Sequence, residues 1–153
     1  MSGINIRMSH TDDYISLRKL YFDNDLEVDL TDPVPEEIVR NWKMTHGQGE
    51  KEYLAAGITL AMRQGEYIID GIAVDPMYRK MGLGSIILKK AIEYVKELGG
   101  KRIYLVARAP EFFKKNGFVV IDRSQGPEFS ECHTCPQFGS KCKPEVMRLD
   151  IVG

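Results

Sequence analysis

The residues with the clearest chemical meaning form a glycine-containing loop, residues 79–85, which reads Arg-Lys-Met-Gly-Leu-Gly-Ser. An apolar stretch with the pattern of a strand precedes the loop, and an amphipathic stretch with the pattern of a helix follows it. Backbone N–H groups at such a junction point toward one spot, and the helix dipole favours negative charge there. Gly82 and Gly84 would let a phosphate approach the backbone closely. The segment therefore predicts a site for phosphate or pyrophosphate.

Two familiar phosphate-binding loops do not fit this segment. A dinucleotide fingerprint requires G-x-G-x-x-G, but the position of the third glycine is occupied by Ile87. A nucleoside-triphosphate loop requires Gly-Lys followed by Ser or Thr, and the segment does not contain that sequence. The predicted phosphate ligand therefore belongs to another class.

A carboxylate, Asp70, interrupts the apolar stretch before the loop. An acid in such a stretch needs a reason, because burying its charge without a partner is costly. Asp70 is therefore a candidate general base, and the alternative is an aspartate that faces solvent or lies at the edge of the strand. Glu66, Tyr67 and Tyr104 are further candidates for proton transfer, and a core or surface role is the alternative for Tyr104.

Three cysteines lie together in a loop that contains Pro and Gly, residues 123–144. Cys132 and Cys135 have the C-x2-C spacing of half a zinc site, and Cys142 would supply a third ligand. The candidates for the fourth ligand are His133, His10, His46, a carboxylate or water. Redox-active or disulfide-forming thiols and free cysteines are the alternatives to a metal site.

The hydrophobic patterns predict the elements that would position these residues. The predicted strands cover residues 4–8, 53–62, 67–74, 102–107, 118–121 and 146–152. The predicted helices are one from a cap at Thr11 or Asp12 to about residue 22, one that starts after Pro33 or Pro35 and includes Ile38, Val39 and Trp42, and two at 85–98 and 111–116. A glycine-containing turn at 63–66 predicts an antiparallel hairpin.

Composition restricts the class of protein. The chain has 153 residues, 43% of them hydrophobic and 28% charged, which fits one globular domain. Its 21 basic and 22 acidic residues give a net charge of −1, which does not favour a general nucleic-acid binder. We find no signal peptide and no apolar stretch of about 20 residues that would span a bilayer. The expected location is the cytoplasm, with no membrane partner.

The loop and a second segment together resemble a known family. Arg-x-x-Gly-x-Gly at 79–84, after Ile-Ala-Val-Asp-Pro at 72–76, resembles the pyrophosphate-binding motif of the GNAT superfamily of N-acetyltransferases. Glu-Phe-Phe-Lys-Lys-Asn-Gly-Phe at 111–118 is similar to a later helix of that family. The order of predicted elements also agrees over nearly the whole chain. The resemblance implies a mixed α/β fold, in which helices flank a mostly antiparallel sheet of six to seven strands, in one domain over residues 1–153.

The resemblance also implies a co-substrate, acetyl-CoA, and the residues that hold it. The implied binding residues are Ile72, Ala73, Val74, Arg79, Lys80, Met81, Gly82, Leu83, Gly84, Ser85 and Phe113. The strand at 72–74 would pair with the pantetheine arm, and a backbone N–H near its end would polarise the carbonyl. The strands that end at Val74 and Ala107 would splay apart and leave a gap for the thioester. A carboxylate near the acceptor amine would be Asp70, and the acidic run at 23–32 would border the acceptor.

The sequence departs from the family pattern at two positions. The usual general acid of the family, a tyrosine, is replaced by Phe113, which has no proton to donate. A frequent asparagine at the end of the preceding strand is Ala107. Three interpretations follow: the CoA thiolate leaves unaided, another residue supplies the proton, or the protein is a poor enzyme.

The resemblance therefore implies an N-acetyltransferase that moves an acetyl group to the primary amine of a small molecule, such as an amino acid, or of a peptide, by direct attack on the thioester. A homodimer is an expected assembly, since family members are often dimers. One alternative is a non-catalytic acyl-CoA-binding sensor, which the substitutions at Phe113 and Ala107 favour. The other is a metal- or redox-responsive interaction protein that uses residues 132–142.

Overall fold

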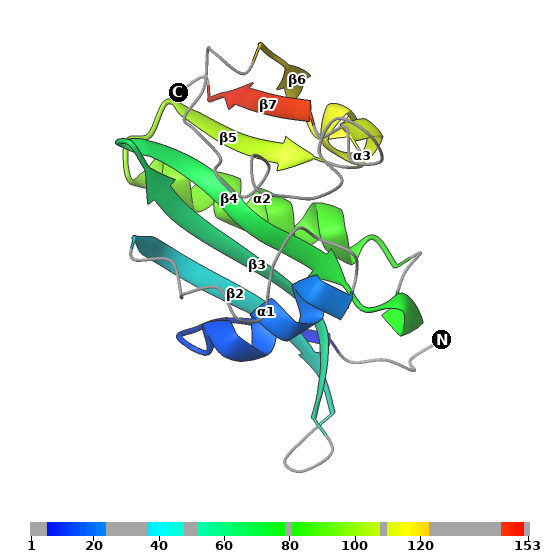
Figure 1. The fold of residues 1–153 in the computed structure, drawn as a ribbon. Coiled ribbons are helices and arrows are strands. Elements are labelled where there is room, and N and C mark those ends of the chain that lie inside the picture. The colour runs from blue at the N-terminus through cyan, green and yellow to red at the C-terminus, as the bar shows by residue number, and fades with distance from the viewer. Residues whose placement is uncertain are drawn as a thin grey trace.

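One mixed sheet of seven strands runs through the described part of the molecule, with helices on both of its faces (Figure 1). The structure is a computed structural model that describes residues 6–23, 37–47, 52–78, 81–107, 110–122 and 145–151. Its elements, in chain order, are β1 (Ile6–Thr11), α1 (Tyr14–Asp23), β2 (Ile38–His46), β3 (Tyr53–Arg63), β4 (Glu66–Val74), the 3₁₀ turn η2 (Pro76–Tyr78), α2 (Leu83–Glu97), β5 (Arg102–Ala107), α3 (Pro110–Lys115), β6 (Val119–Val120) and β7 (Glu145–Asp150).

The strand order in the sheet is β1-β2-β3-β4-β5-β7-β6. Neighbouring strands are antiparallel except β4 and β5, which are parallel. A parallel connection needs a crossover, and α2 is the helix that leads from the end of β4 back to the start of β5. The predicted mixed, mostly antiparallel sheet of six to seven strands with flanking helices is confirmed.

The helices α1 and α2 lie on opposite faces of this sheet (Figure 1). The apolar side of α2 joins the main core, which includes Ile58 of β3 and Leu105 of β5. On the other face, Leu17 and Tyr21 of α1 pack with Ala73 of β4. We call these two sides of the sheet the α2 face and the α1 face. The central strands are therefore covered on both sides, as their nearly continuous apolar sequence requires.

The amphipathic pattern of α2 explains why this segment is a helix. Its buried side chains recur at intervals of one, three and four residues and are Leu83, Ile87, Leu88, Ala91 and Val95. The helix stops at Gly99, which has a φ of 83°, in the left-handed region that favours glycine. The N–H groups of Gly99 and Gly100 donate to the carbonyls of Lys96 and Val95 and so cap the last turn. The predicted helix at 85–98 is confirmed.

A two-residue turn joins β3 and β4 into the predicted hairpin. Gln64 and Gly65 both have positive φ, 53° and 80°, and the flanking residues Arg63 and Glu66 pair with each other. Two positive φ values match the twist of the flanking strands in a tight hairpin. The predicted antiparallel hairpin is therefore confirmed.

One predicted helix is wrong. The segment that contains Ile38, Val39 and Trp42 is strand β2, which pairs with β1 on one side and β3 on the other. The spacing of these three residues is compatible with a helix, but β-branched and aromatic residues also suit a strand that is packed between two neighbours. Pairing with β1 and β3 is what makes this segment a strand and not a helix.

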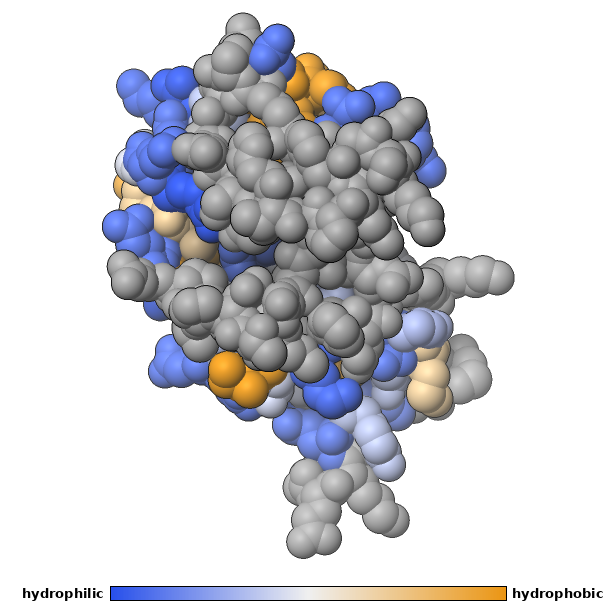
Figure 2. All heavy atoms as spheres, in the orientation of Figure 1, coloured by the Kyte–Doolittle hydropathy of each residue, from blue (hydrophilic) through white to orange (hydrophobic). Residues whose placement is uncertain are grey.

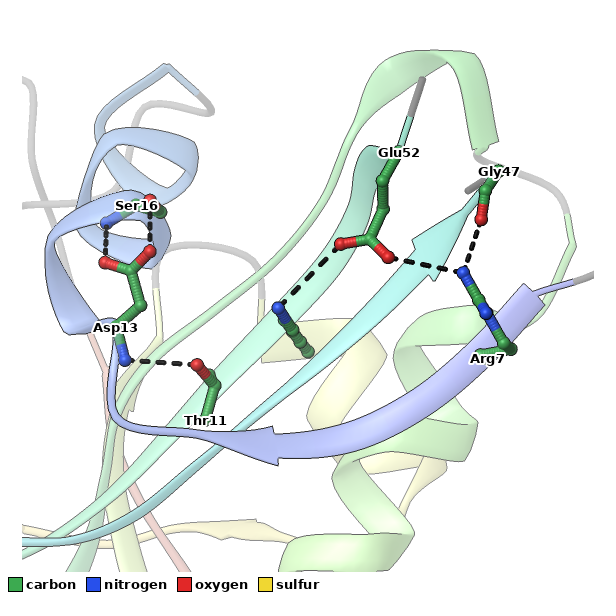
Figure 3. Close-up of polar contacts among 7 residues, drawn as sticks. Arg7, Thr11, Asp13, Ser16, Gly47 and Glu52 are labelled. Carbon is green, nitrogen blue, oxygen red and sulfur yellow. Dashed lines mark hydrogen bonds and ion pairs between the residues drawn. The ribbon is translucent and has the colours of Figure 1, made fainter. Parts of the chain in front are cut away.

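An aspartate caps the start of α1, as Figure 3 shows. Asp13 Oδ1 accepts a hydrogen bond from the backbone N–H of Ser16 (3.2 Å), and Oδ2 accepts one from the Ser16 hydroxyl (2.7 Å). These two hydrogen bonds, that to the hydroxyl first, lower the pKa of Asp13. The prediction of a cap at Thr11 or Asp12 is therefore wrong by one or two residues, although the Thr11 hydroxyl does accept from the N–H of Asp13 (3.1 Å).

Charged side chains link the strands at the β1 side of the sheet. Arg7 of β1 donates to the carbonyl of Gly47 and forms an ion pair with Glu52, at 3.2 Å (Figure 3). Lys43 of β2 lies 4.0 Å from the same carboxylate. These side chains are partly exposed, and ion pairs at the surface contribute little to stability, so we expect this group to add little to the stability of the fold.

The described residues at the surface of the α1 face are mostly polar. Figure 2 shows that hydrophilic side chains predominate among the coloured residues and that apolar ones form separate spots. The exposed large apolar residues of the described part include Ile15 and Val119. Within the described residues, no helix is long and apolar enough to cross a membrane.

Candidate active site

The loop predicted to bind phosphate leaves the end of β4 through a fixed turn. The N–H of Asp75 donates to the carbonyl of Ala55 on β3 (2.8 Å), and the Asp75 carboxylate accepts from the N–H of Met77 (3.0 Å). In η2 the N–H of Tyr78 donates to the carbonyl of Asp75 (2.9 Å). The hydroxyl of the buried Tyr78 lies 3.1 Å from Nδ1 of His46. The direction in which the chain leaves the sheet is therefore set by β3, β4 and β2 together.

The start of α2 has a geometry that suits an anion. Gly82 precedes the helix with a φ of 74°, and no side chain caps the helix there. Among the described residues, none comes within 4 Å of a Cβ placed at Gly82, so these neighbours leave its backbone accessible to a ligand. The first turn of α2 contains no acidic residue. Because the first N–H groups of a helix have no partner within the helix and lie at its positive end, these residues fit a pyrophosphate.

The absence of a side chain at Gly84 lets neighbouring elements pack closely. A Cβ at Gly84 would lie 3.1 Å from the ring of Phe112 on α3 and 3.6 Å from Val74 at the end of β4. The missing side chain lets α3 approach the first turn of α2. Asn116, just beyond α3, donates to the carbonyl of Phe112 (2.9 Å) and lies 3.5 Å from the hydroxyl of Ser85. The loop, the end of β4 and α3 therefore meet at this glycine.

A gap between β4 and β5 opens beside this loop. The two strands pair at only two positions, the second being Ile68 with Tyr104. Beyond it, β4 follows β3 as far as Val74, whereas β5 follows β7 as far as Ala107. Residues 69–74 of β4 therefore have no described strand partner on the side of β5. The predicted splay of these two strands is present, and the edge it leaves on β4 can pair with an extended ligand.

Asp70 lies in this part of β4, two residues beyond the last pair with β5, and it is the extra residue of a β-bulge. Thr59 of β3 pairs with Gly71, and the next residue, Leu60, pairs with Ile69. A bulge of this kind changes the direction of the side chains that follow it. The side chain of Ile69 belongs to the core on the α2 face, and Asp70 and Gly71 both turn toward α1.

Two tyrosines of α1 converge on the bulge. The hydroxyl of Tyr14 donates to Oδ2 of Asp70, at 3.1 Å. The ring of Tyr21 lies over Gly71, where a Cβ would come within 2.6 Å of two of its atoms. Tyr14 and Tyr21 are seven residues apart and therefore lie on the same side of the helix. The bulge therefore turns Asp70 toward the Tyr14 hydroxyl and places Gly71 against the Tyr21 ring.

The hydroxyl of Tyr21 belongs to a buried chain of hydrogen bonds. It lies 2.7 Å from the hydroxyl of Thr59, which donates to Oδ1 of Asn41, also at 2.7 Å. Because a threonine hydroxyl has one proton, Tyr21 must be the donor to Thr59. Burial raises the pKa of Tyr21 well above its ordinary value, and the nearby charge of Asp70 adds to that rise. Tyr21 therefore remains a neutral donor.

The other predicted binding residues that the structure describes lie around the loop and the gap. Ile72 and Val74 pack against the core on the α2 face, and Ala73 faces α1. Leu83 is buried in the core, whereas Met81 is exposed. These residues can offer backbone groups to a ligand, but Leu83 cannot offer its side chain. Arg79 and Lys80 lie outside the described residues. The assignment of all these residues to co-substrate binding stays a prediction.

The further candidates for proton transfer do not gather around the bulge. Glu66 and Tyr67 lie at the start of β4, where Tyr67 pairs with Ile103 of β5. Tyr104 is buried in a separate apolar cluster. Of the candidates from the sequence, Asp70 is the one that lies in the part of β4 with no described strand partner on the side of β5.

Phe113 occupies a packed position. It is buried, and its ring makes edge-to-face contacts with Phe112 and Phe118, with ring centroids 5.0 Å and 5.8 Å apart. Ala107 is also buried. Phe113 therefore fixes α3 against the core, and its predicted contact with the co-substrate stays a prediction.

The predicted metal site cannot be located from the described residues. Cys132, His133, Cys135 and Cys142 all lie outside them, as does the acidic run at 23–32 except for Asp23. Within the ranges that the structure describes, no group of three or more His, Cys, Asp or Glu side chains could hold a metal ion. The zinc site, the homodimer, the cytoplasmic location and the single-domain boundaries stay predictions.

Sequence reasoning missed the partners of Asp70. Tyr14 and Tyr21 lie on the apolar side of the first helix, and their hydroxyl groups give no separate signal in the sequence. The bulge depends on the register between β3 and β4, which is a long-range property. The heptad spacing of the two tyrosines, together with an acid and a glycine adjacent in one strand, is the signal that could have indicated this cluster.

Comparison with known proteins supports the family that the sequence resembles. Residues 13–118, more than half of the chain, match the family model for the acetyltransferase (GNAT) family. The matched segment contains α1, the bulge, the loop at 79–85 and α3.

Solved structures share the fold at low identity. A GNAT-family acetyltransferase from Staphylococcus aureus superimposes with a TM-score of 0.68 at 16% identity, over 97% of this chain and 100% of that one. The ribosomal-protein-S18-alanine N-acetyltransferase from Escherichia coli gives 0.61 at 18%, over 97% of each chain. The N-acetylglutamate synthase from Neisseria gonorrhoeae, complexed with coenzyme A and N-acetyl-glutamate, gives 0.66 at 17%, over 100% of this chain and 36% of that one. The chain belongs to the GNAT family of acetyltransferases.

Proposed function

We propose that this GNAT-family protein transfers an acetyl group from acetyl-CoA to the primary amine of a small molecule or peptide, by direct attack of the amine on the thioester. The observation that carries the proposal is the separation of β4 from β5 beyond Ile68. Asp70 lies in the part of β4 that has no described strand partner on the side of β5, with its side chain turned toward α1, and the start of α2 follows the end of β4. A thioester in the gap between these strands would lie between a phosphate-binding helix start and a carboxylate.

Backbone groups would do most of the binding. The N–H groups around Gly82 and Ser85 would hold the pyrophosphate, with Arg79 and Lys80 adding positive charge. Residues 72–74, whose edge toward β5 has no described strand partner, would pair with the pantetheine arm as an added strand does. A binding mode of this kind depends on the course of the main chain.

The chemistry needs a neutral amine and a polarised carbonyl. Acetyl-CoA supplies an acetyl group activated by its thioester. Asp70 would accept a proton from the amine, and a backbone N–H near Ala73 or Val74 would donate to the carbonyl oxygen. The nitrogen of the neutral amine forms a bond to the acetyl carbon and gives up to Asp70 the proton it loses, while the carbon–sulfur bond breaks. Because Phe113 has no proton to donate, we propose that CoA leaves as a thiolate.

The structural relatives suggest the range of acceptors to test. One is complexed with an N-acetylated amino acid, and another is named for an alanine of a ribosomal protein. Both acceptors are amino acids, one free and one part of a protein. At this level of identity, neither selects the acceptor, so a panel must contain free amino acids, polyamines and peptides with a free N-terminus.

Binding is tested by titrating acetyl-CoA into the wild type and a Ser85→Glu variant. Ser85 lies in the first turn of α2, where a glutamate would favour the helix through its dipole and repel a phosphate. The variant should therefore remain folded but bind acetyl-CoA at least about tenfold more weakly, because like charges would meet in the site. Ser85→Gln, of the same size but uncharged, is the matched control. Equal binding by wild type and Ser85→Glu would contradict the proposed site.

Turnover is then tested by release of CoA across the amine panel, with wild type and Asp70→Asn. A general base contributes roughly 10² to 10⁴ in rate, so the variant should lose at least about 100-fold. The packed, hydroxyl-free Phe113 favours a second candidate, a protein that binds acyl-CoA without turnover. Tight acetyl-CoA binding with no turnover of any amine would support that sensor instead.

A further inference from the structure

The contact between Tyr14 and Asp70 joins a helix to the strand that carries the proposed base. Tyr14 is the first residue of α1, and it is 6% exposed. Its ring belongs to the apolar cluster under α1, and its hydroxyl reaches out of that cluster to Oδ2 of Asp70, 3.1 Å away. A phenol that donates to a carboxylate restricts the directions the carboxylate can take.

Other contacts hold α1 in place independently of that hydroxyl. The ring of Tyr21 lies over Gly71, and its hydroxyl donates to Thr59. Leu17 packs against the backbone of Gly57, where a Cβ would lie 2.5 Å from the leucine side chain. Asp13 caps the first turn. We therefore expect α1 to keep its position when the Tyr14 hydroxyl is removed.

The position of Asp70 makes its orientation matter. The bulge sets its backbone, but an aspartate side chain retains two rotatable bonds. A general base must come within hydrogen-bond reach of the proton it takes, so a carboxylate that samples several directions is less effective. Two described side chains of α1, Tyr14 and Tyr21, lie near Asp70. Both are phenols, and a phenol can orient the carboxylate without neutralising its charge.

We infer that Tyr14 is a positioning residue: its hydroxyl holds the Asp70 carboxylate in the orientation that receives the proton of the acceptor amine. The inference rests on the proposed function, because it assumes that Asp70 is the base. Tyr14 itself need not touch the substrate. It acts through the carboxylate, so its effect on the rate disappears when the carboxylate is removed.

A double-mutant cycle tests this inference with Tyr14→Phe, Asp70→Asn and the double variant. The probe is the best amine of the panel described above, with kcat measured at saturating acetyl-CoA. Tyr14→Phe should lower kcat on the order of tenfold, the value of about one hydrogen bond to a charged group, and leave the KM for acetyl-CoA unchanged. In the Asp70→Asn background, the same change should have no further effect on kcat. Tyr53→Phe, which removes a hydroxyl from an exposed side chain, is the matched control.

The possible outcomes distinguish a failure of the role of Tyr14 from a failure of the role of Asp70 as the base. If Asp70→Asn lowers kcat and Tyr14→Phe lowers it by the same factor in both backgrounds, the tyrosine acts on its own, and the inference is wrong while the base stands. If Asp70→Asn keeps full activity, Asp70 is not the base, and the inference about Tyr14 is then also wrong. Lack of turnover with every amine would overturn both. Melting temperatures and acetyl-CoA binding of all four proteins show that the comparison is between folded proteins.

Discussion

The hydroxyl of Tyr21 donates to Thr59, which donates to Asn41, so these side chains connect α1, β3 and β2 through the protein interior. Tyr21→Phe removes the first donor and leaves the buried Thr59 oxygen with one hydrogen bond fewer. We expect the free energy of unfolding to fall by about 1–3 kcal/mol. Urea unfolding measures this change, and Tyr53→Phe, on an exposed residue, should change it little. An equal effect of the two substitutions would contradict the importance of the buried chain.

The same hydroxyl predicts how stability depends on alkaline pH. Burial raises the pKa of Tyr21 in the folded protein above the value of about 10 expected in the unfolded chain. The folded state then holds the proton more tightly, so the contribution is complete below about pH 10 and is lost as pH rises above it. Between pH 9 and 11, the free energy of unfolding should fall more steeply for wild type than for Tyr21→Phe. Parallel slopes in urea titrations would show that Tyr21 is not the group responsible.

For single residues, the sequence indicates which side chains could take part in chemistry, but it does not show their hydrogen-bond partners. Asp70 could be recognised because an acid in an apolar stretch is unusual. Gly82 could be recognised because a glycine before a helix marks a ligand or a turn, and its positive φ agrees. Tyr14 could not, because a tyrosine in an amphipathic stripe is usually a packing residue. Its hydrogen bond becomes visible only when the register between β3 and β4 is known.

The packing of α1 on the sheet depends on two glycines. A Cβ at Gly71 would lie 2.6 Å from the rigid ring of Tyr21, whereas one at Gly57 would meet the flexible end of Leu17 at 2.5 Å. An aromatic ring cannot move aside without shifting the helix, but a leucine can change rotamer. We expect Gly71→Ala to cost about 1–3 kcal/mol in stability and Gly57→Ala to cost less. Chemical denaturation of both variants measures the difference, and the reverse order would contradict this account.

Elements with local signals could be predicted, and elements fixed by distant pairing could not. The apolar face of α2 and the turn at Gln64 and Gly65 both depend on residues that are close together in the sequence. Strand β2 was mistaken for a helix because its residues fit either period, and what makes it a strand is pairing with β1 and β3. The family resemblance predicted the mixed, mostly antiparallel sheet correctly despite that error, because the resemblance depends on the order of all the elements.

The gap of the candidate site is a property of the whole molecule. Its walls are β4 and β5, and β5 is held away from β4 by pairing with β7, near the end of the chain. The helix start that would bind phosphate is positioned by the turn at Asp75, which is hydrogen-bonded to β3. The sequence could name the loop, but the splay of the strands comes from contacts between segments far apart in the chain.

Because the binding site is built from the whole sheet, a ligand that occupies it should stabilise the whole fold. Acetyl-CoA at about 100 times its dissociation constant should add about 2.7 kcal/mol, since it binds the folded state alone. For a chain of this size, that corresponds to a rise of roughly 5–10 °C in melting temperature. Differential scanning calorimetry measures the rise, with Ser85→Glu as the variant that should show little of it and Ser85→Gln as the control that should retain it. If the wild type melted at the same temperature with and without acetyl-CoA, the gap and the start of α2 would not form its site. If Ser85→Glu showed the full rise, the ligand would bind elsewhere on the protein.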